Sequence, residues 1–217
     1  MENNAFLEAW LQLLRENKAI AIIRSPDFDL AYNMALAVAA GGANLIEITW
    51  SGERSGELIT KLRTELSHHT IGTGTILNLP QLQQAYLAGA QFAFAPHFDP
   101  TLLEVSLSRY KIPFIPGVSS PTELVNAWQH GAKVVKVFPI KFLGGAEYIR
   151  CLQGPLKQIP LIPTGGITID NARETIDAGA IAVGISSNLF PQEAILNRDW
   201  SSITTRTQML LHKLHRH

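Results

Sequence analysis

The sequence has almost no cysteine, no excess of either charge and no long hydrophobic run. Cys151 is the only cysteine among 217 residues, which excludes an intramolecular disulfide and a multi-cysteine zinc site. The 18 basic and 18 acidic residues balance to zero net charge, so composition gives no support to nucleic-acid binding. No apolar run reaches the ~18 residues of a membrane-spanning helix, and no histidine–carboxylate spacing suggests a metal site. We expect a cytoplasmic protein with no nucleic-acid, membrane or metal partner.

What the sequence does contain is a weak internal repeat. Four segments share one plan, in which a helical stretch is followed by a Gly-Ala pair and a short apolar run. The pairs begin at Gly42, Gly89, Gly131 and Gly179, which are 47, 42 and 48 residues apart. Glycine suits the left-handed position that ends a helix, and the apolar run suits a buried strand. Each junction therefore predicts a helix, a glycine cap and a strand.

Four more strand candidates lie between the repeats, and helical patterns fill the gaps. These strands are predicted at 19–23, 70–76, 112–118 and 160–164. Eight strands that alternate with helices predict an α/β protein with a parallel sheet. Because one βαβα unit recurs four times, we favour a closed (β/α)8 TIM barrel over an open doubly wound sheet.

The domain organisation follows from the same pattern. Helical spacing of apolar residues predicts an extra N-terminal helix over 1–17, and not a signal peptide. No linker rich in Pro, Gly or Ser interrupts the series that follows. We therefore expect a single domain over 1–217, with the barrel at 18–190 and a C-terminal helical segment at 191–217.

The repeat also predicts a register for the even-numbered strands. Glu47, Phe94, Lys136 and Gly184 each lie five residues after a repeat glycine. In a barrel, alternate strands supply the side chains of one interior layer, so Glu47 and Lys136 are expected to face each other. Two residues further, nearer the carboxyl-terminal rim where barrel active sites are built, the next layer holds Thr49, Pro96, Phe138 and Ser186.

Lys136 and Glu47 are charged residues inside otherwise apolar strands. Burial of a charge costs several kcal/mol unless it is paired, and burial lowers the pKa of a lysine. A neutral amine is a nucleophile that forms Schiff bases with carbonyl compounds. The pair therefore indicates either catalysis at a barrel mouth, which we favour, or a structural Lys–Glu ion pair.

Two turns rich in glycine and serine follow the last two predicted strands. Gly165-Gly166 follows the seventh strand, and Ser186-Ser187 follows the eighth. Loops at these places commonly form the phosphate site of a (β/α)8 barrel. The alternative is that they are only turns.

Six motifs, taken together, resemble the KDPG/KHG aldolase family. They are Ile46-Glu47-Ile48-Thr49, Ile71-Gly72-Thr73-Gly74-Thr75, Ala95-Pro96-His97, Pro116-Gly117-Val118-Ser119, Lys136-Val137-Phe138-Pro139 and Pro163-Thr164-Gly165-Gly166-Ile167. The resemblance covers about residues 18 to 190. It implies a class I aldolase that cleaves 2-keto-3-deoxy-6-phosphogluconate, with 4-hydroxy-2-oxoglutarate as a possible second substrate. It also implies a homotrimeric (β/α)8 barrel of carbohydrate metabolism that needs no metal or organic cofactor.

The resemblance assigns roles residue by residue. The Schiff-base lysine of the family falls on Lys136, and its acid/base glutamate falls on Glu47. The pyruvate-pocket positions fall on Thr75, Pro96 and Phe138. The phosphate positions fall on Gly165, Gly166 and Ser187, beside Ser186 of the same turn.

One departure concerns the carboxylate of the substrate. Some members of the family have an arginine four residues after the glutamate, where this chain has Ser51. Other members have an arginine at the end of the first strand, and Arg24 matches that position. We therefore assign the carboxylate to Arg24, with Arg54 as a weaker candidate.

Two other hypotheses remain beside the Schiff-base aldolase. One is a different phosphate-binding barrel enzyme, such as an isomerase or synthase, which would not need an imine at Lys136. The other is a non-catalytic barrel that binds phosphorylated metabolites.

Overall fold

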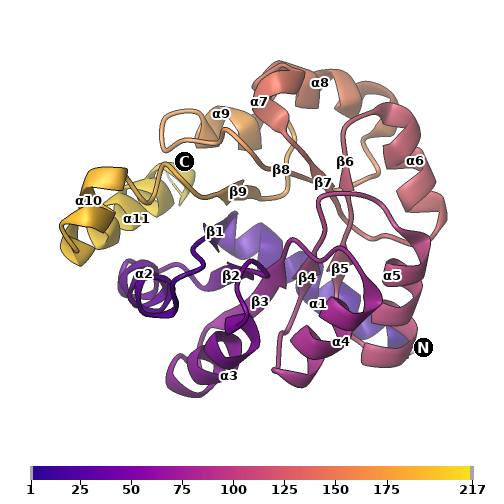
Figure 1. Cartoon of the computed structure of the whole chain (residues 1–217). Helices are drawn as coiled ribbons and strands as arrows, with labels where there is room; N and C mark the ends of the chain where they lie inside the picture. Colours follow the sequence, from indigo (N-terminus) through magenta and orange to yellow (C-terminus); the bar gives the residue numbers. More distant parts are fainter. Residues whose placement is uncertain (1, 216–217) are drawn as a thin grey trace.

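Parallel strands alternate with helices in the computed structural model of the chain, which describes residues 2–215 (Figure 1). The strands are β1 (Ala19–Ile23), β2 (Leu45–Thr49), β3 (Thr70–Gly74), β4 (Ala93–Phe94), β5 (Phe114–Ile115), β6 (Gly117–Val118), β7 (Val135–Val137), β8 (Leu161–Pro163) and β9 (Val183–Ile185). The predicted N-terminal helix is α1 (Glu2–Asn17). Residues 1, 216 and 217 of the predicted terminal segments lie outside the described residues.

The other helices surround the strands. They are α2 (Phe28–Ala40), α3 (Ser55–Glu65), α4 (Leu79–Leu87), α5 (Pro100–Val105), the π-helix η1 (Ser106–Tyr110), α6 (Pro121–Gln129), α7 (Ile140–Leu143), α8 (Gly145–Leu156), α9 (Ala172–Asp177), α10 (Gln192–Leu196) and α11 (Trp200–His215). None of the helices within residues 2–215 combines the length and apolarity needed to span a membrane.

The strands form two parallel sheets, which confirms the predicted parallel α/β arrangement. A six-stranded sheet has the order β5-β4-β3-β2-β1-β9 and curves as a half-barrel, and a three-stranded sheet has the order β6-β7-β8. The strand predicted at 112–118 is two short segments, β5 and β6, on either side of Pro116. Proline has no N–H for the ladder, and pairing changes there from β4 to β7.

The repeat glycines end their helices as predicted. Gly42, Gly89, Gly131 and Gly179 have φ values of +95°, +88°, +100° and +111°. A Cβ on Gly131 would meet no atom within 4 Å, so the left-handed backbone alone favours glycine there. Each cap therefore fixes where the next strand begins.

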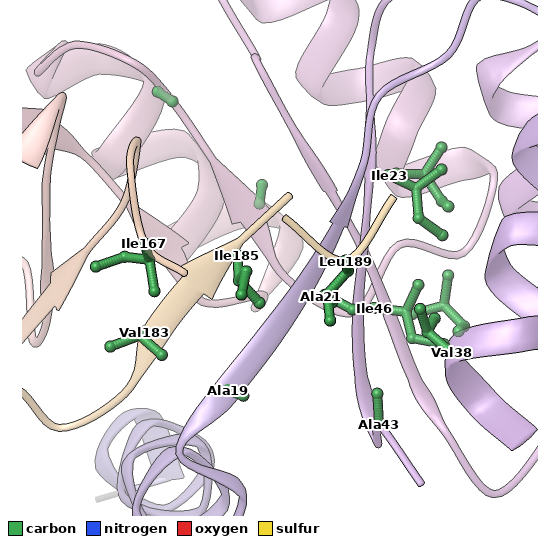
Figure 2. Close-up of a cluster of buried hydrophobic side chains, with 14 of the residues drawn as sticks. Ala19, Ala21, Ile23, Val38, Ala43, Ile46, Ile167, Val183, Ile185 and Leu189 are labelled. Atoms are coloured by element: carbon green, nitrogen blue, oxygen red, sulfur yellow. The ribbon is translucent and has the colours of Figure 1, made fainter. Parts of the chain in front are cut away.

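Successive side chains of β1 point alternately into two different apolar layers. Ala19, Ala21 and Ile23 pack toward the surrounding helices, as Figure 2 shows for Ala21 near Ile46 and Val38 of α2. Because successive side chains of a strand point to opposite faces, the residues between them point inward. The inward residues belong to an inner cluster made of Trp10, Leu11, Leu14, Ile20, Ile22, Leu45, Phe92, Phe94, Ile115, Val134, Ile162 and Ala182.

Helix α1 covers the amino-terminal end of this inner cluster. Its Trp10 ring stacks on Phe92 at 4.9 Å between centroids, and Leu14 is completely buried. Leu45, the first residue of β2, and Val134, directly before β7, belong to the same cluster. The opposite end, where the strands finish, is left open for polar groups.

We expect Leu14→Ala to lower the free energy of unfolding by about 2–5 kcal/mol, because it removes a fully buried side chain and leaves a cavity. Leu87→Ala is the matched control, because Leu87 at the end of α4 is 73% exposed. Its effect is expected to stay within about 0.5 kcal/mol. Urea unfolding followed by circular dichroism measures both, and equal losses would contradict the role given to α1.

Candidate active site

A cavity of ≈230 Å³ lies at the carboxyl ends of the strands. It is lined by Ile22, Arg24, Glu47, Lys136, Phe138, Thr164, Gly165, Gly166, Ile167, Gly184, Ser186 and Ser187. Eight of the ten predicted site residues are therefore brought together, from β2 and β7 and from the segments that follow β1, β7, β8 and β9.

Glu47 in β2 and Lys136 in β7 point into the space that the strands surround, in the register that the repeat predicts. Their exposed fractions are 1% and 5%. No hydrogen bond or ion pair joins them, and Glu47 Oε2 has no hydrogen-bond partner within the described part of the chain. The two groups share one cavity but are not locked together as a structural ion pair.

Burial shifts the pKa values of both groups toward their neutral forms. It raises the pKa of Glu47, against the attraction of Lys136 and Arg24, which lowers it. Burial lowers the pKa of Lys136, against the attraction of Glu47, and repulsion from Arg24 lowers it further. The cavity therefore holds an amine that can lose its proton beside a carboxyl that can carry one.

Two aromatic rings flank the Lys136 amine. Its Nζ atom lies 4.9 Å from the centroid of Phe138 and 5.7 Å from that of Phe94. These rings limit access of water to the amine, which is consistent with its strong desolvation. Phe94 belongs to the inner cluster, so the amine lies where the apolar interior meets the polar cavity.

Glycine leaves room for the polar atoms on neighbouring strands. A Cβ on Gly74 of β3 would lie 1.7 Å from Glu47 Oε1, so any larger residue would displace the carboxyl group. A Cβ on Gly184 of β9 would lie 2.5 Å from Thr164 Oγ1. Both glycines are required for space at the wall of the cavity.

Arg24 is the arginine that reaches the cavity. It follows β1, is exposed, and its Nη2 donates to Thr75 Oγ1 at 3.5 Å. Thr75 has φ +63°, an uncommon conformation for a β-branched residue. Arg54 instead donates twice to Glu57, at 2.7 Å each, and so is held away from this role.

The two turns predicted to bind phosphate lie together at one side of the cavity. Gly165 and Gly166 have φ values of +86° and +102°. The Asn171 side chain donates to the Gly166 carbonyl at 3.1 Å. Asn188 Oδ1 accepts from the Ile169 N–H at 2.8 Å, which ties the turn after β9 to the turn after β8.

Two predicted residues are not in the cavity lining, and four lining residues, with Thr164 among them, were not predicted as site residues. Thr75 is linked to the site through Arg24, whereas Pro96 lies beside Gly117, whose Cβ would be 2.5 Å from the Pro96 carbonyl carbon. Thr164 was not predicted, although it immediately precedes Gly165 in a quoted motif. It lines the cavity, and its buried Oγ1 has no hydrogen-bond partner among the described residues.

Potential metal ligands do not cluster in the part of the chain that the structure describes. Within the described residues, no group of three or more histidine, cysteine, aspartate or glutamate side chains is placed to hold a metal ion. The chemistry available to this chain's own residues is that of an amine, a carboxyl group, a guanidinium group and hydroxyl groups.

Comparison with known proteins gives one consistent family. The profile of the family described as KDPG and KHG aldolase matches residues 11–206. A 2-dehydro-3-deoxy-phosphogluconate aldolase of Treponema pallidum is 32% identical over 92% of this chain and 95% of its own. A KHG/KDPG aldolase of Escherichia coli K12 is 32% identical over 88% and 90%.

Solved structures agree with these sequence relatives. The KDPG aldolase of Legionella pneumophila, with pyruvate captured as a covalent carbinolamine intermediate, superposes with a TM-score of 0.84 at 30% identity. That match covers 92% of this chain and 97% of the other. The aldolase of Zymomonas mobilis ZM4 with 3-phosphoglycerate gives 0.83 at 26% identity, covering 92% and 93%. The chain belongs to the KDPG and KHG aldolase family, and it is an aldolase of the lyase class.

Proposed function

We propose that this aldolase cleaves 2-keto-3-deoxy-6-phosphogluconate to pyruvate and glyceraldehyde 3-phosphate through a Schiff base on Lys136. The observation that carries the proposal is the pair of buried groups, Lys136 and Glu47, which share a cavity without an ion pair. The names of the relatives and the carbinolamine in the Legionella structure support the same chemistry. Cleavage of 4-hydroxy-2-oxoglutarate to pyruvate and glyoxylate is the second proposed reaction, in line with the relatives named KHG/KDPG aldolase.

The first half of the reaction uses the neutral amine. Lys136 Nζ attacks the C2 keto carbon of the substrate to give a carbinolamine, which takes up a proton from solvent, loses water and becomes an iminium. Glu47, directly or through a water molecule, takes the proton of the C4 hydroxyl group. The C3–C4 bond then breaks, its electrons enter the iminium to give an enamine, and the aldehyde leaves.

The second half returns the proton. Glu47, now protonated, gives a proton to C3 of the enamine, and hydrolysis of the resulting iminium releases pyruvate and restores Lys136. The raised pKa of Glu47 suits a group that must carry a proton between these two steps. General acid–base catalysis of this kind typically contributes about 10²–10⁴-fold.

The remaining cavity residues bind the two ends of the substrate in this proposal. Arg24 holds the carboxylate, with Thr75 beside it, and Phe138 and Pro96 shape the pyruvate pocket. The main-chain N–H groups of Gly165 and Gly166 and the hydroxyls of Ser186 and Ser187 bind the phosphate. The unpartnered hydroxyl of Thr164 is suited to a hydrogen bond with a substrate oxygen.

We also propose that the two sheets form one closed (β/α)8 barrel in a single domain over 1–217. Thr164, after β8, forms a parallel bridge with Gly184 of β9, and the Ile181 N–H donates to the Leu161 carbonyl at 3.0 Å. The inner cluster takes side chains from both sheets, for example Ile20 from β1 and Ile162 from β8. These contacts support closure on one side, and the continuity of β5 with β6 through Pro116 supports it on the other.

Three properties are proposed from the family resemblance. They are a homotrimeric assembly, a cytoplasmic location, and a place in the Entner–Doudoroff branch of carbohydrate metabolism. The proposed reaction needs no metal or organic cofactor, because Lys136 itself supplies the electron sink.

Reductive trapping tests the imine. We expect borohydride in the presence of pyruvate to add a pyruvate-sized mass to the wild-type protein and to Lys133→Ala, but not to Lys136→Ala. Lys133 is a matched control because it lies on the same segment and in the opposite strand phase. Mass spectrometry of the labelled peptide measures the outcome. Labelling that persists in Lys136→Ala would exclude the Schiff-base mechanism at this residue, and a phosphate-binding isomerase or a non-catalytic barrel would show none.

The pH dependence of trapping tests the electrostatics. Because burial lowers the pKa of Lys136, we expect the trapping rate to reach half its maximum below the ordinary lysine value of 10.5. Glu47→Gln removes the attraction that raises this pKa, so the midpoint is expected to move lower still. Glu104→Gln, on an exposed residue of α5, is the control and leaves the midpoint unchanged. An upward shift in Glu47→Gln would contradict the assigned coupling.

Substrate comparison tests Arg24. Arg24→Ala is expected to remove a charge-assisted contact to the carboxylate that both substrates share. The resulting loss of transition-state stabilisation, measured from the decrease in kcat/KM, is expected to be about 1.5–3 kcal/mol for both substrates. Arg54→Ala is the control, and we expect it to keep wild-type values because Arg54 is paired with Glu57. Steady-state kinetics with the phosphorylated sugar acid and 4-hydroxy-2-oxoglutarate measure this. Unchanged values in Arg24→Ala would remove Arg24 from the site. Equal wild-type values of kcat/KM for the two substrates would contradict the preference for a phosphorylated substrate that the proposed phosphate site implies.

A further inference from the structure

The proposed phosphate site lacks a cation of its own in the cavity lining. The charged residues that line the cavity are Arg24, Glu47 and Lys136, and each already has a role at the carboxylate or the reacting carbon. The turns supply only N–H and hydroxyl donors to a group that carries close to two negative charges at neutral pH. A nearby basic side chain would therefore increase affinity for the phosphate.

Lys141, in the short helix α7, is fixed against the turn that follows β8. Its main-chain N–H donates to the Gly165 carbonyl at 3.0 Å, and the Ile140 N–H donates to the Thr164 carbonyl at 2.9 Å. A Cβ on Gly166 would lie 2.3, 3.1 and 3.2 Å from Lys141 Cβ, Cγ and Cδ. The stem of the lysine therefore runs along Gly166 itself, and it leaves no room for a side chain at that position.

The ammonium group of Lys141 lies only two bonds beyond the Cδ atom that contacts Gly166. The residue is exposed, and the part of the chain that the structure describes gives its side chain no hydrogen bond or ion pair. Other basic groups near the two turns are already engaged. Arg206 Nε donates to the Asn188 carbonyl at 2.8 Å, and Lys213 pairs with Asp170 at 2.6 Å.

We propose that Lys141 binds the distal phosphate of the substrate and sets the preference of this aldolase for phosphorylated 2-keto acids. The inference rests on the proposed function, because it takes the Gly165-Gly166 turn as the phosphate site. The contact is solvent-exposed, so its strength is modest and falls as ionic strength rises. Lys141 takes no part in the imine chemistry, which occurs at the other end of the substrate.

Steady-state kinetics with two substrates that differ only in the phosphate test this role. Lys141→Met keeps the length of the stem and removes the charge. We expect it to lower kcat/KM for 2-keto-3-deoxy-6-phosphogluconate by roughly two- to fivefold at low salt, and to leave cleavage of unphosphorylated 2-keto-3-deoxygluconate unchanged. Lys141→Arg restores most of the difference. The control Lys157→Met, an exposed lysine that follows α8 and precedes β8, has no effect on either substrate.

A binding measurement separates failure of this proposal from failure of the proposed function. The probe is 3-phosphoglycerate, which has a carboxylate and a phosphate but no keto group and so forms no imine. Calorimetric titration is expected to show a several-fold weaker dissociation constant in Lys141→Met, with recovery in Lys141→Arg. If the wild type cleaved neither sugar acid but showed this pattern, the aldolase assignment would fail while the Lys141 site would stand. Equal losses on both substrates, an unchanged dissociation constant, or no binding to the wild type would overturn the Lys141 site.

Discussion

Desolvation of two ionisable side chains in the interior of a strand assembly is the constraint on which this structure depends. Glu47 and Lys136 are almost fully buried, and no direct ion pair offsets the cost of burying their charges. Their pKa values shift in opposite directions, so both approach neutrality. The stability that this arrangement costs must come from elsewhere, and the inner cluster under α1, with Trp10 and Leu14, supplies apolar burial directly below the site.

Space for these groups is provided by residues without side chains on neighbouring elements. Gly74 leaves room for the Glu47 carboxyl group, and Gly184 leaves room for the Thr164 hydroxyl group. Gly166 leaves room for the aliphatic part of the Lys141 side chain. In each case the glycine lies on an adjacent strand or turn and not next to the polar residue in the sequence. Gly74 and Gly184 therefore serve a different purpose from Gly42 and the other repeat glycines, which are selected by a left-handed backbone, whereas Gly166, with φ +102°, meets both requirements.

The difference between these two kinds of glycine explains which features could be predicted from the sequence. A glycine cap fixes the start of the following strand, and alternation then fixes which side chains face inward, so Glu47 and Lys136 could be placed from the repeat alone. Thr164 and Asn188 could not be found in this way, because their roles depend on loop conformation and on hydrogen bonds between separate turns, which follow no period. Pro96 was predicted to belong to the pyruvate pocket, but it lies against Gly117 and is not part of the cavity lining.

The distribution of charge along the cavity fits the chemistry of a substrate with two anionic ends. Arg24 marks one end and the Gly165-Gly166 turn marks the other, while the centre holds groups driven toward neutrality by burial. If the anionic ends are bound where solvent and donors are available, their binding energy can be used, in the proposed mechanism, to bring the keto carbon against the Lys136 amine, whose pKa is lowered by burial. The central groups need no attraction for the substrate in its ground state. In the proposed mechanism, charge develops at the iminium and at the C4 oxygen, and the low-polarity surroundings strengthen the interaction between these two neighbouring charges.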